Sequence, residues 1–311
     1  MAASSIPAPA EVTAPTAADN AAVIDRFLGF WDGTLTPMEA IEARHAVRSY
    51  TDEPIAAGTV EALRRAIAIV NDETNLNIQL VLDEPRAFSG FKARLVNFTG
   101  ARNYLALVGP ECKELDGIVG YYGEKLVLLA QSLGLNSCWV GGTYKMVNRS
   151  YNVDLGQKLT AVIALGYGTT AGVPHKSKTP DQVCPGYDDA PAWFQRGVDA
   201  ALLAPTALNR QPFSFSLIGT DDEGTPLVSA RTKRGAFTQM DLGIAQCHFE
   251  IGAGAAPLRL GRPLTAAGAC QCQGDGSLDI DICRGNRPLD TPSYTKFNSC
   301  ARNAISVRLR H

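Results

Sequence analysis

The chain has 311 residues and a mass of 33.1 kDa, and 45% of its residues are hydrophobic, which excludes disorder over the whole chain. Its 29 basic and 31 acidic residues leave a net charge of −2, so it lacks the bulk positive charge that holds a nucleic acid, and we expect no nucleic-acid partner. No apolar run reaches the roughly 18 residues of a membrane-spanning helix, so we expect no membrane partner either.

The chain opens with a segment that predicts no structure. Its first 22 residues hold nine Ala and three Pro, without the basic and apolar regions of a secretory signal, so we expect a disordered leader over residues 1–30. Residues 36–39 (Thr-Pro-Met-Glu) then predict a helix start, with Thr36 as the N-cap and Glu39 completing a capping box. We expect this helix to continue into residues 44–50 and to break before Pro54.

A regular succession of elements follows. Apolar residues at helical spacing predict a helix over residues 60–70, and alternation predicts a strand over residues 76–82. The next predictions are a strand at 104–108, a helix at 116–133 ended by Gly134, a strand at 136–140 closed by Gly141 and Gly142, and a strand at 159–165 followed by a basic loop at 174–180.

A second round of elements begins after residue 186. It comprises a helix at 193–203, a strand at 213–218, and a helix that Asp241 caps and Gly252 ends. The order helix, strand, helix repeats that of the first round. Two short matches accompany it: Asn77-Ile78-Gln79 with Asn209-Arg210-Gln211 at a shift of 132, and Ala130-Gln131 with Ala245-Gln246 at a shift of 115. These features favour an internal duplication, with a first half at 31–184 and a degenerate second half at 185–256.

The end of the chain is different again. No helix or strand period persists there, which predicts an irregular tail over residues 257–311. The eight cysteines of the chain are too sparse for a disulfide scaffold and fit free thiols in a reducing cytoplasm, where we place the protein. Neither the cysteines nor the four histidines have the spacing of metal ligands, so we expect no metal, and we expect His248 to be a packed helix residue. The tail cysteines are Cys270, Cys272, Cys283 and Cys300.

Basic residues form two candidate anion sites. Arg44 and Arg48 are four residues apart, so on a continued helix both could reach one anion, although a solvated helix end would show the same spacing. Lys176 and Lys178 lie in a loop flanked by prolines and could contact a phosphate, or could simply be solvated. Spacing alone leaves both alternatives open.

Two further segments could present fixed groups to a ligand. The loop at 204–213 places Thr206 and Asn209 between two prolines, a rigid arrangement that suits a flat polar heterocycle but also an ordinary helix-to-strand turn. Gly141 and Gly142 follow a strand, where glycine permits close approach of a ligand to the backbone or simply forms a turn.

Together these motifs resemble those of the flavin-dependent nitroreductase family, over residues 36 to 256. Residues 44–50 (Arg-His-Ala-Val-Arg-Ser-Tyr) are similar to the N-terminal arginine motif of the family, and residues 133–141 to its Gly-Leu-x-x-x-Trp-x-Gly segment. Residues 204–213 resemble its Ala-Pro-Ser-x-x-Asn-x-Gln-Pro-Trp loop, and residues 164–178 its strand and Lys-x-Arg phosphate loop.

The order of the motifs resembles the fused, internally duplicated branch of that family. The Pro-Thr-x-x-Asn loop is found only in the second half, whereas the arginine motif is found only in the first. The resemblance implies an α+β fold with central, mostly antiparallel sheets, flanking helices, and two related halves that form a pseudo-dimer. A monomer would then carry a site that ordinary members build between two subunits.

The resemblance also implies a role for each motif residue, with FMN as the cofactor. Arg44, Lys176 and Lys178 would neutralise the phosphate. Ala46 stands where the family has Ser, and Lys178 where it has Arg, which removes a hydroxyl donor and a bidentate fork. The ribityl chain and the pyrimidine edge would be lined by His45, Ala46 and Arg48. From the second half, the flavin would be approached by Pro205, Thr206 and Asn209. The backbone of Val140, Gly141 and Gly142 would lie near flavin N5. No catalytic side chain is assigned.

The resemblance implies an FMN oxidoreductase that takes electrons from NAD(P)H and passes them to an electron-poor small molecule such as a nitroaromatic or a quinone. One alternative is a flavin-binding or interaction protein whose site has decayed and does not turn over. Another is a structural α+β protein without flavin.

Overall fold

The structure is a computed structural model that describes residues 31, 33–221, 224–254 and 259–260. The predicted leader at 1–30 and nearly all of the predicted tail at 257–311, including its cysteines, lie outside the described residues. The chain divides into two units, 1–275 and 276–311, and everything described here belongs to the first. No described helix combines the length and apolar character needed to cross a membrane.

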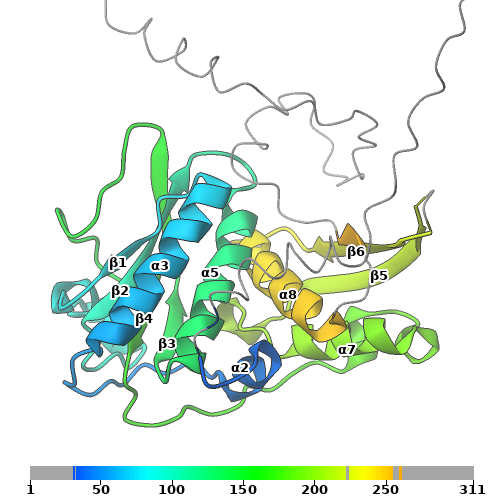
Figure 1. The fold of residues 1–311 in the computed structure, drawn as a ribbon, viewed down its shortest axis with the longest axis horizontal. Helices are drawn as coiled ribbons and strands as arrows, with labels where there is room; N and C mark the ends of the chain where they lie inside the picture. Colours follow the sequence, from blue (N-terminus) through cyan, green and yellow to red (C-terminus); the bar gives the residue numbers. More distant parts are fainter. Residues whose placement is uncertain (1–30, 32, 222–223, 255–258, 261–311) are drawn as a thin grey trace, which may run out of the picture. The chain divides into compact units, whose positions relative to one another are not determined.

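The first half contains a four-stranded antiparallel sheet in the order β1-β2-β4-β3. Two long helices, α3 and α5, pack beside it in Figure 1. The elements of this half are α2 (Pro37–Ala43), α3 (Ala57–Thr74), β1 (Gln79–Val81), η1 (Pro85–Phe88), α4 (Phe91–Leu95), β2 (Asn103–Pro110), α5 (Leu115–Ser132), β3 (Asn136–Val140), β4 (Gln157–Gly166) and α6 (Pro180–Val183).

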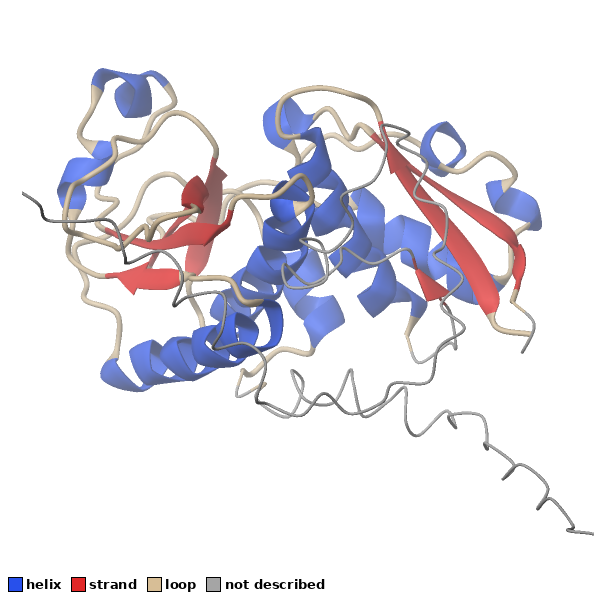
Figure 2. Cartoon of the chain, turned by 90° about the horizontal axis from the view of Figure 1, so that it is seen from above, coloured by secondary structure: helices blue, strands red, loops and turns tan. Residues whose placement is uncertain are grey.

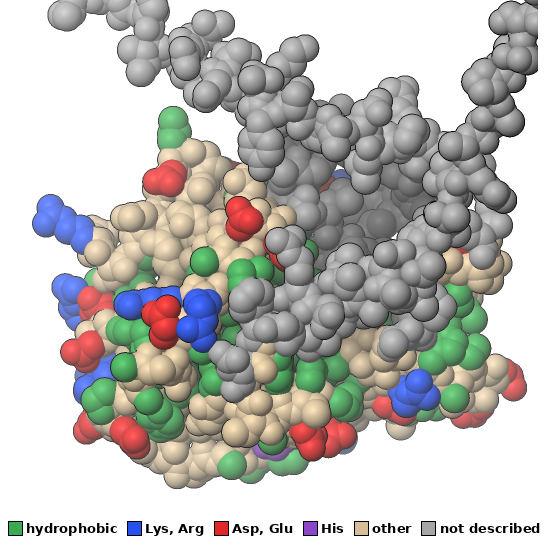
Figure 3. Space-filling model, viewed as in Figure 1, with side chains coloured by type: hydrophobic (Ala, Val, Ile, Leu, Met, Phe, Trp, Pro, Cys, Tyr) green, Lys and Arg blue, Asp and Glu red, His purple; other side chains and the backbone are tan. Residues whose placement is uncertain are grey.

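The central strand β2 is buried on both faces. Leu105 and Leu107 belong to the larger core cluster on one side of the sheet, whereas Tyr104 and Ala106 belong to a second cluster on the other. Side chains alternate between the faces of a strand, so burial of both faces explains why β2 reads as a continuous apolar run. On the face shown in Figure 3, acidic and basic side chains lie beside one another over the left-hand part of the molecule.

The second half contains a smaller sheet in the order β5-β6-β7, with β5 antiparallel and β7 parallel to β6. Figure 2 shows the two sheets on opposite sides of a central group of helices. One core cluster includes side chains from both halves, and it contains a stack of Phe215 on Phe249 at 4.6 Å. The elements are η2 (Tyr187–Asp189), α7 (Ala192–Leu202), η3 (Ala207–Asn209), β5 (Phe213–Thr220), β6 (Pro226–Thr232), α8 (Thr238–Ala253) and β7 (Arg259–Leu260).

The two halves are related by a single offset in sequence. The strands β2 and β6 begin at residues 103 and 226, and the helices α5 and α8 begin at residues 115 and 238, so an offset of 123 residues relates both pairs. The helices also touch symmetrically: a Cβ at Gly120 would lie 2.2 Å from the Met240 carbonyl oxygen, and a Cβ at Gly243 would lie 2.1 Å from that of Gly117. Under this offset Gly117 corresponds to Met240 and Gly120 to Gly243, the reciprocal pattern of a two-fold contact.

Most of the predicted elements are confirmed, including the capping box of Thr36 and Glu39 and the strand at 136–140. Strand β6 was not predicted, and the predicted strand at 76–82 is reduced to β1. The match of Ala130-Gln131 with Ala245-Gln246 does not relate α5 to α8, because its shift of 115 differs from the structural offset.

Both predicted ends of α8 are wrong. The helix begins after Phe237, which occupies the N-cap position, so Asp241 lies inside the helix rather than at its cap. It continues past Gly252 to its C-cap, Gly254, whose φ of +72° is strained for any residue with a Cβ.

Candidate functional site

The segment after α2 is extended rather than helical. Its Val47 amide donates a 3.0 Å hydrogen bond to the Ser137 carbonyl, and Ala46 forms a parallel bridge with Ser137 on β3. The backbone groups of the segment are therefore bonded to a strand about 90 residues away. The prediction that Arg44 and Arg48 share a helix face is wrong, since Arg44 is buried and Arg48 is exposed.

The buried guanidinium of Arg44 lies at the junction of the two halves. Its Nε is 3.5 Å from Oε1 of Glu124, a fully buried carboxylate on α5. Glu124 also accepts from Nε1 of Trp139 at 2.7 Å and lies 2.9 Å from Nε2 of His248 on α8. Burial lowers the pKa of Arg44, and the charge of Glu124 opposes that effect. The prediction that His248 is a packed residue is confirmed.

The loop after β4 packs on the extended segment. Gly172 has a φ of +78°, and a Cβ at this position would lie 2.7 Å from the Cβ of His45. Glycine is therefore required both for the backbone conformation and for the close approach. This contact brings the loop that carries Lys176 and Lys178 alongside His45, which is half-buried, and Ala46, which is exposed.

The loop between α7 and β5 is conformationally strained. Three of its residues that are not glycine have positive φ angles: Leu208 at 55°, Asn209 at 52° and Gln211 at 45°. Each such residue costs roughly 1–3 kcal/mol, so the surrounding structure must hold them in place. Strain of this kind clusters at ligand sites, and these residues lie within the family-like loop at 204–213.

Gln211 holds this loop to the first half. Its Oε1 accepts from the Lys178 amide at 2.7 Å, and its backbone carbonyl accepts from Lys178 Nζ at 2.6 Å. Its Nε2 donates to the Leu202 carbonyl at 2.7 Å, and its amide donates to Thr206 Oγ1 at 3.0 Å. Gln211 was absent from the predicted site, although an amide side chain just before a buried strand is a signal that sequence reasoning could have used.

A second bond joins the same two loops. Nδ2 of Asn209 donates to the Lys176 carbonyl at 2.7 Å. The Lys176 side chain is exposed and the Lys178 side chain is half-buried, while Pro205 and Thr206 are also half-buried. The first-half lysine loop and the second-half loop, predicted to act at one site, are therefore in direct contact.

Asp241 forms a hydrogen bond with the beginning of the strained loop. Its Oδ1 accepts from the Ala207 amide at 2.8 Å, whereas its buried Oδ2 has no hydrogen-bond partner among the described residues. Burial raises the pKa of this carboxyl to about 6, and the bond from Ala207 opposes the shift. Sequence reasoning took Asp241 for a helix cap and missed this contact, because Ala207 lies 34 residues away.

An aromatic residue of the second half lies against the end of β3. A Cβ at Gly141 would be 2.5 to 3.0 Å from three carbons of the Phe237 ring, whereas a Cβ at Gly142 would meet nothing within 4 Å. Phe237 has a φ of +64°, which is rare for a bulky side chain, and remains 37% exposed. Val140, just before the glycines, is buried. Sequence reasoning did not single out Phe237.

Through these contacts five segments form a ring in which each one touches the next: 44–50, β3 with the glycines that follow it, the start of α8, the loop before β5, and the loop after β4. All the predicted site residues lie on the four segments other than the start of α8: Arg44, His45, Ala46, Arg48, Val140, Gly141, Gly142, Lys176, Lys178, Pro205, Thr206 and Asn209. The exposed cations Arg48 and Lys176, the open backbone at Gly142 and the strained loop fit an anionic, planar ligand. Arg44 fits it less well, because its Nε already faces Glu124, whereas Lys178 uses only one donor on Gln211.

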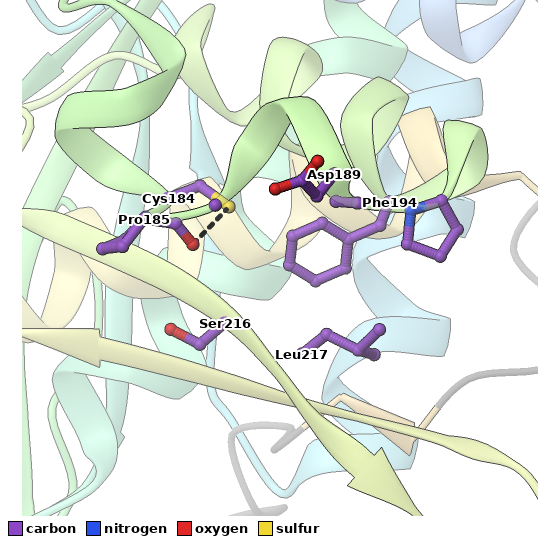
Figure 4. A pocket seen from close by; sticks show the side chains of 9 residues that line it. Cys184, Pro185, Asp189, Phe194, Ser216 and Leu217 are labelled. Atoms are coloured by element: carbon purple, nitrogen blue, oxygen red, sulfur yellow. Dashed lines mark hydrogen bonds between the residues drawn. The ribbon is translucent and has the colours of Figure 1, made fainter.

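A separate pocket lies beside the start of α7. It measures about 220 Å³ and is formed by the segment that leads into α7 together with β5, as Figure 4 shows. None of the predicted site residues lines it; its lining residues are Cys184, Pro185, Gly186, Asp189, Ala190, Pro191, Phe194, Ser216 and Leu217.

The described part of the chain holds no cluster of metal ligands. Within it, no three His, Cys, Asp or Glu side chains are grouped to hold a metal ion. Cys138, Cys184 and Cys247 are buried free thiols.

Comparison with known proteins identifies the family. A sequence model of the family described as "Putative TM nitroreductase" matches residues 36–253. No curated protein matches the chain. Among solved structures, the chain resembles a "putative nitroreductase" from Thermotoga maritima, with 21% identity, a TM-score of 0.48, and coverage of 69% of this chain and 82% of that one.

Two further solved structures match over a shorter span. A nitroreductase with bound FMN from Bacteroides fragilis is 23% identical, with a TM-score of 0.35 and coverage of 47% of this chain and 95% of that one. Nitroreductase A from Vibrio parahaemolyticus is 17% identical, with a TM-score of 0.39 and coverage of 48% and 74%. The family match spans well over half of the chain, and the chain therefore belongs to this nitroreductase family.

Proposed function

We propose that the chain is an FMN-dependent oxidoreductase that takes electrons from NAD(P)H and passes them to an electron-poor small molecule such as a nitroaromatic or a quinone. The observation that carries this proposal is the contact between the lysine loop of the first half and the strained loop of the second, through Asn209 and Gln211. Family membership supports the same activity.

The residues proposed to bind FMN fall into a charged group for the phosphate and a group for the ribityl chain and pyrimidine edge. Lys176 and Lys178 supply positive charge for the phosphate, and Lys178 keeps two donors after its bond to Gln211. A direct phosphate contact from Arg44 would have to use its Nη atoms, because Nε faces Glu124. His45, Ala46 and Arg48 would lie along the ribityl chain and pyrimidine edge.

FMN, when bound, supplies the redox chemistry at its isoalloxazine ring. The residues of the chain orient it and exclude water. The open backbone at Gly142 permits close approach at the end of β3, beside Val140 and Gly141. From the second half, Pro205, Thr206 and Asn209 would approach the ring, and the Phe237 side chain would cover the site beside Gly141.

We further propose that one chain is sufficient for the site, in a monomer with an internal pseudo-dimer. The first half (31–184) and the second half (185–256) each supply loops that contact the other. Their long helices, α5 and α8, pack through reciprocal glycine contacts as two subunits would.

The visible spectrum of the purified protein, with added FMN where needed, tests this function. We expect flavin absorption bands that NADH or NADPH bleaches without oxygen and that a quinone or nitroaromatic restores. A flavin that neither nucleotide reduces would indicate a binding protein with a decayed site. Absence of FMN binding at micromolar concentration would overturn the proposal.

A further inference from the structure

A second lysine lies beside Lys178. The Lys233 amide, in the loop between β6 and α8, donates to the Pro212 carbonyl at 3.2 Å. Lys178 Nζ donates to the carbonyl of the preceding residue, Gln211, at 2.6 Å. The Lys178 ammonium and the Lys233 backbone, one from each half of the chain, are therefore bonded to consecutive peptide groups of the same loop.

The charges of these two lysines act on each other. Burial lowers the pKa of Lys178, and the positive charge of Lys233 lowers it further. Within the described residues, neither lysine takes part in an ion pair. Like charges that act on each other without a counter-ion repel, and an anion bound by both would relieve that repulsion.

We propose that Lys178 and Lys233 form a phosphate clamp across the two halves, in which Lys233 is a ligand of the FMN phosphate. The identity of the ligand rests on the function proposed above. A phosphate monoester carries nearly two negative charges at neutral pH, which matches two ammonium groups. Lys178 stands where the family motif has Arg, and it donates one of its hydrogen bonds to Gln211. Lys233, from the second half, therefore replaces the donor that the first half lacks.

The test compares FMN with riboflavin, which has the same ring system without the phosphate. Lys233→Gln should weaken FMN binding by about ten- to a hundredfold and leave riboflavin binding unchanged. Lys233→Arg should retain FMN binding. Arg231→Gln is the matched control: Arg231 is exposed on β6, bonds to Ser229, and the substitution removes the same charge nearby.

A second measurement separates the clamp from the flavin proposal. Inorganic phosphate should raise the melting temperature of the apo protein, and Lys233→Gln should remove this effect. If no flavin binds but phosphate protection depends on Lys233, the flavin proposal fails and the clamp stands. If FMN binds and Lys233→Gln lowers its affinity no more than Arg231→Gln does, the clamp is overturned and the flavin proposal stands.

Discussion

Asn209 donates a 2.7 Å hydrogen bond from Nδ2 to the backbone carbonyl of Lys176, 33 residues earlier and in the other half of the chain. A side chain that only capped the turn before β5 would bond within its own loop. This bond instead ties the strained second-half loop to the lysine loop, so a change at Asn209 acts on both.

We expect Asn209→Ala to weaken FMN binding, because the two loops would no longer be held together. The apo protein should lose only about 1 kcal/mol of unfolding free energy, the usual worth of one exposed hydrogen bond. Titration with FMN and chemical denaturation measure the two effects. Asn75→Ala is the matched control, since Asn75 is exposed, has a φ of +58° and is the C-cap of α3. Equal FMN affinity in the two variants would show that Asn209 has only a structural role.

Arg44→Ala should lower the unfolding free energy of the apo protein by about 3–5 kcal/mol, because it leaves the buried Glu124 without its cation. Arg64→Ala should change it by less than about 0.5 kcal/mol, since Arg64 is exposed on α3. Urea denaturation without flavin measures both. The double variant Arg44→Met with Glu124→Gln should lose less than the two single changes combined; strict additivity would contradict the pairing.

Asp241 should make stability depend on pH below neutrality. Its pKa is raised to about 6 from an ordinary 3.8, so the folded state binds the proton more tightly than the unfolded state. Its contribution is therefore largest below about pH 4, and on the order of 3 kcal/mol is lost as the pH rises through about 6. The unfolding free energy of the native protein relative to Asp241→Asn should fall over this range and then stay level. A difference that does not change with pH would contradict the raised pKa.

Gly141→Ala should destabilise the apo protein, whereas Gly142→Ala should not. A new Cβ at residue 141 would collide with the Phe237 ring, while a Cβ at residue 142 would meet none of the described residues within 4 Å. We expect a loss of about 1–3 kcal/mol in the unfolding free energy of the apo protein for the first variant only. Phe237→Ala added to Gly141→Ala should recover most of the lost stability. If the two glycine variants behave alike, Phe237 does not pack as described.

The pseudo-dimer predicts one FMN for each monomeric chain, because the first half alone carries the arginine motif and the second half alone carries the Pro-Thr-x-x-Asn loop. Light scattering with flavin quantitation measures both quantities in one experiment. Two flavins per chain, or loss of flavin when a dimer dissociates, would show that the site needs another arrangement.

Much of the fold could be predicted because it depends on local patterns. The apolar stripe of α3, the capping box at Thr36 and the apolar run of β2 each follow from residues within one element. The family motifs lie on segments that the structure brings into contact across the two halves. These features need only the periodicity of helices and strands and the identity of short motifs.

Tertiary structure alone decided what the individual side chains do. Residues 44–50 have a helix-compatible pattern, yet they are extended because the edge of β3 offers their backbone partners from about 90 residues away. Arg44 is buried because α5 places Glu124 beside it, and Lys178 is engaged because the strained loop presents Gln211. The sequence determined which segments carry the family motifs, whereas long-range pairing determined which charges remain free, because desolvation and hydrogen bonding depend on neighbours that no local pattern contains.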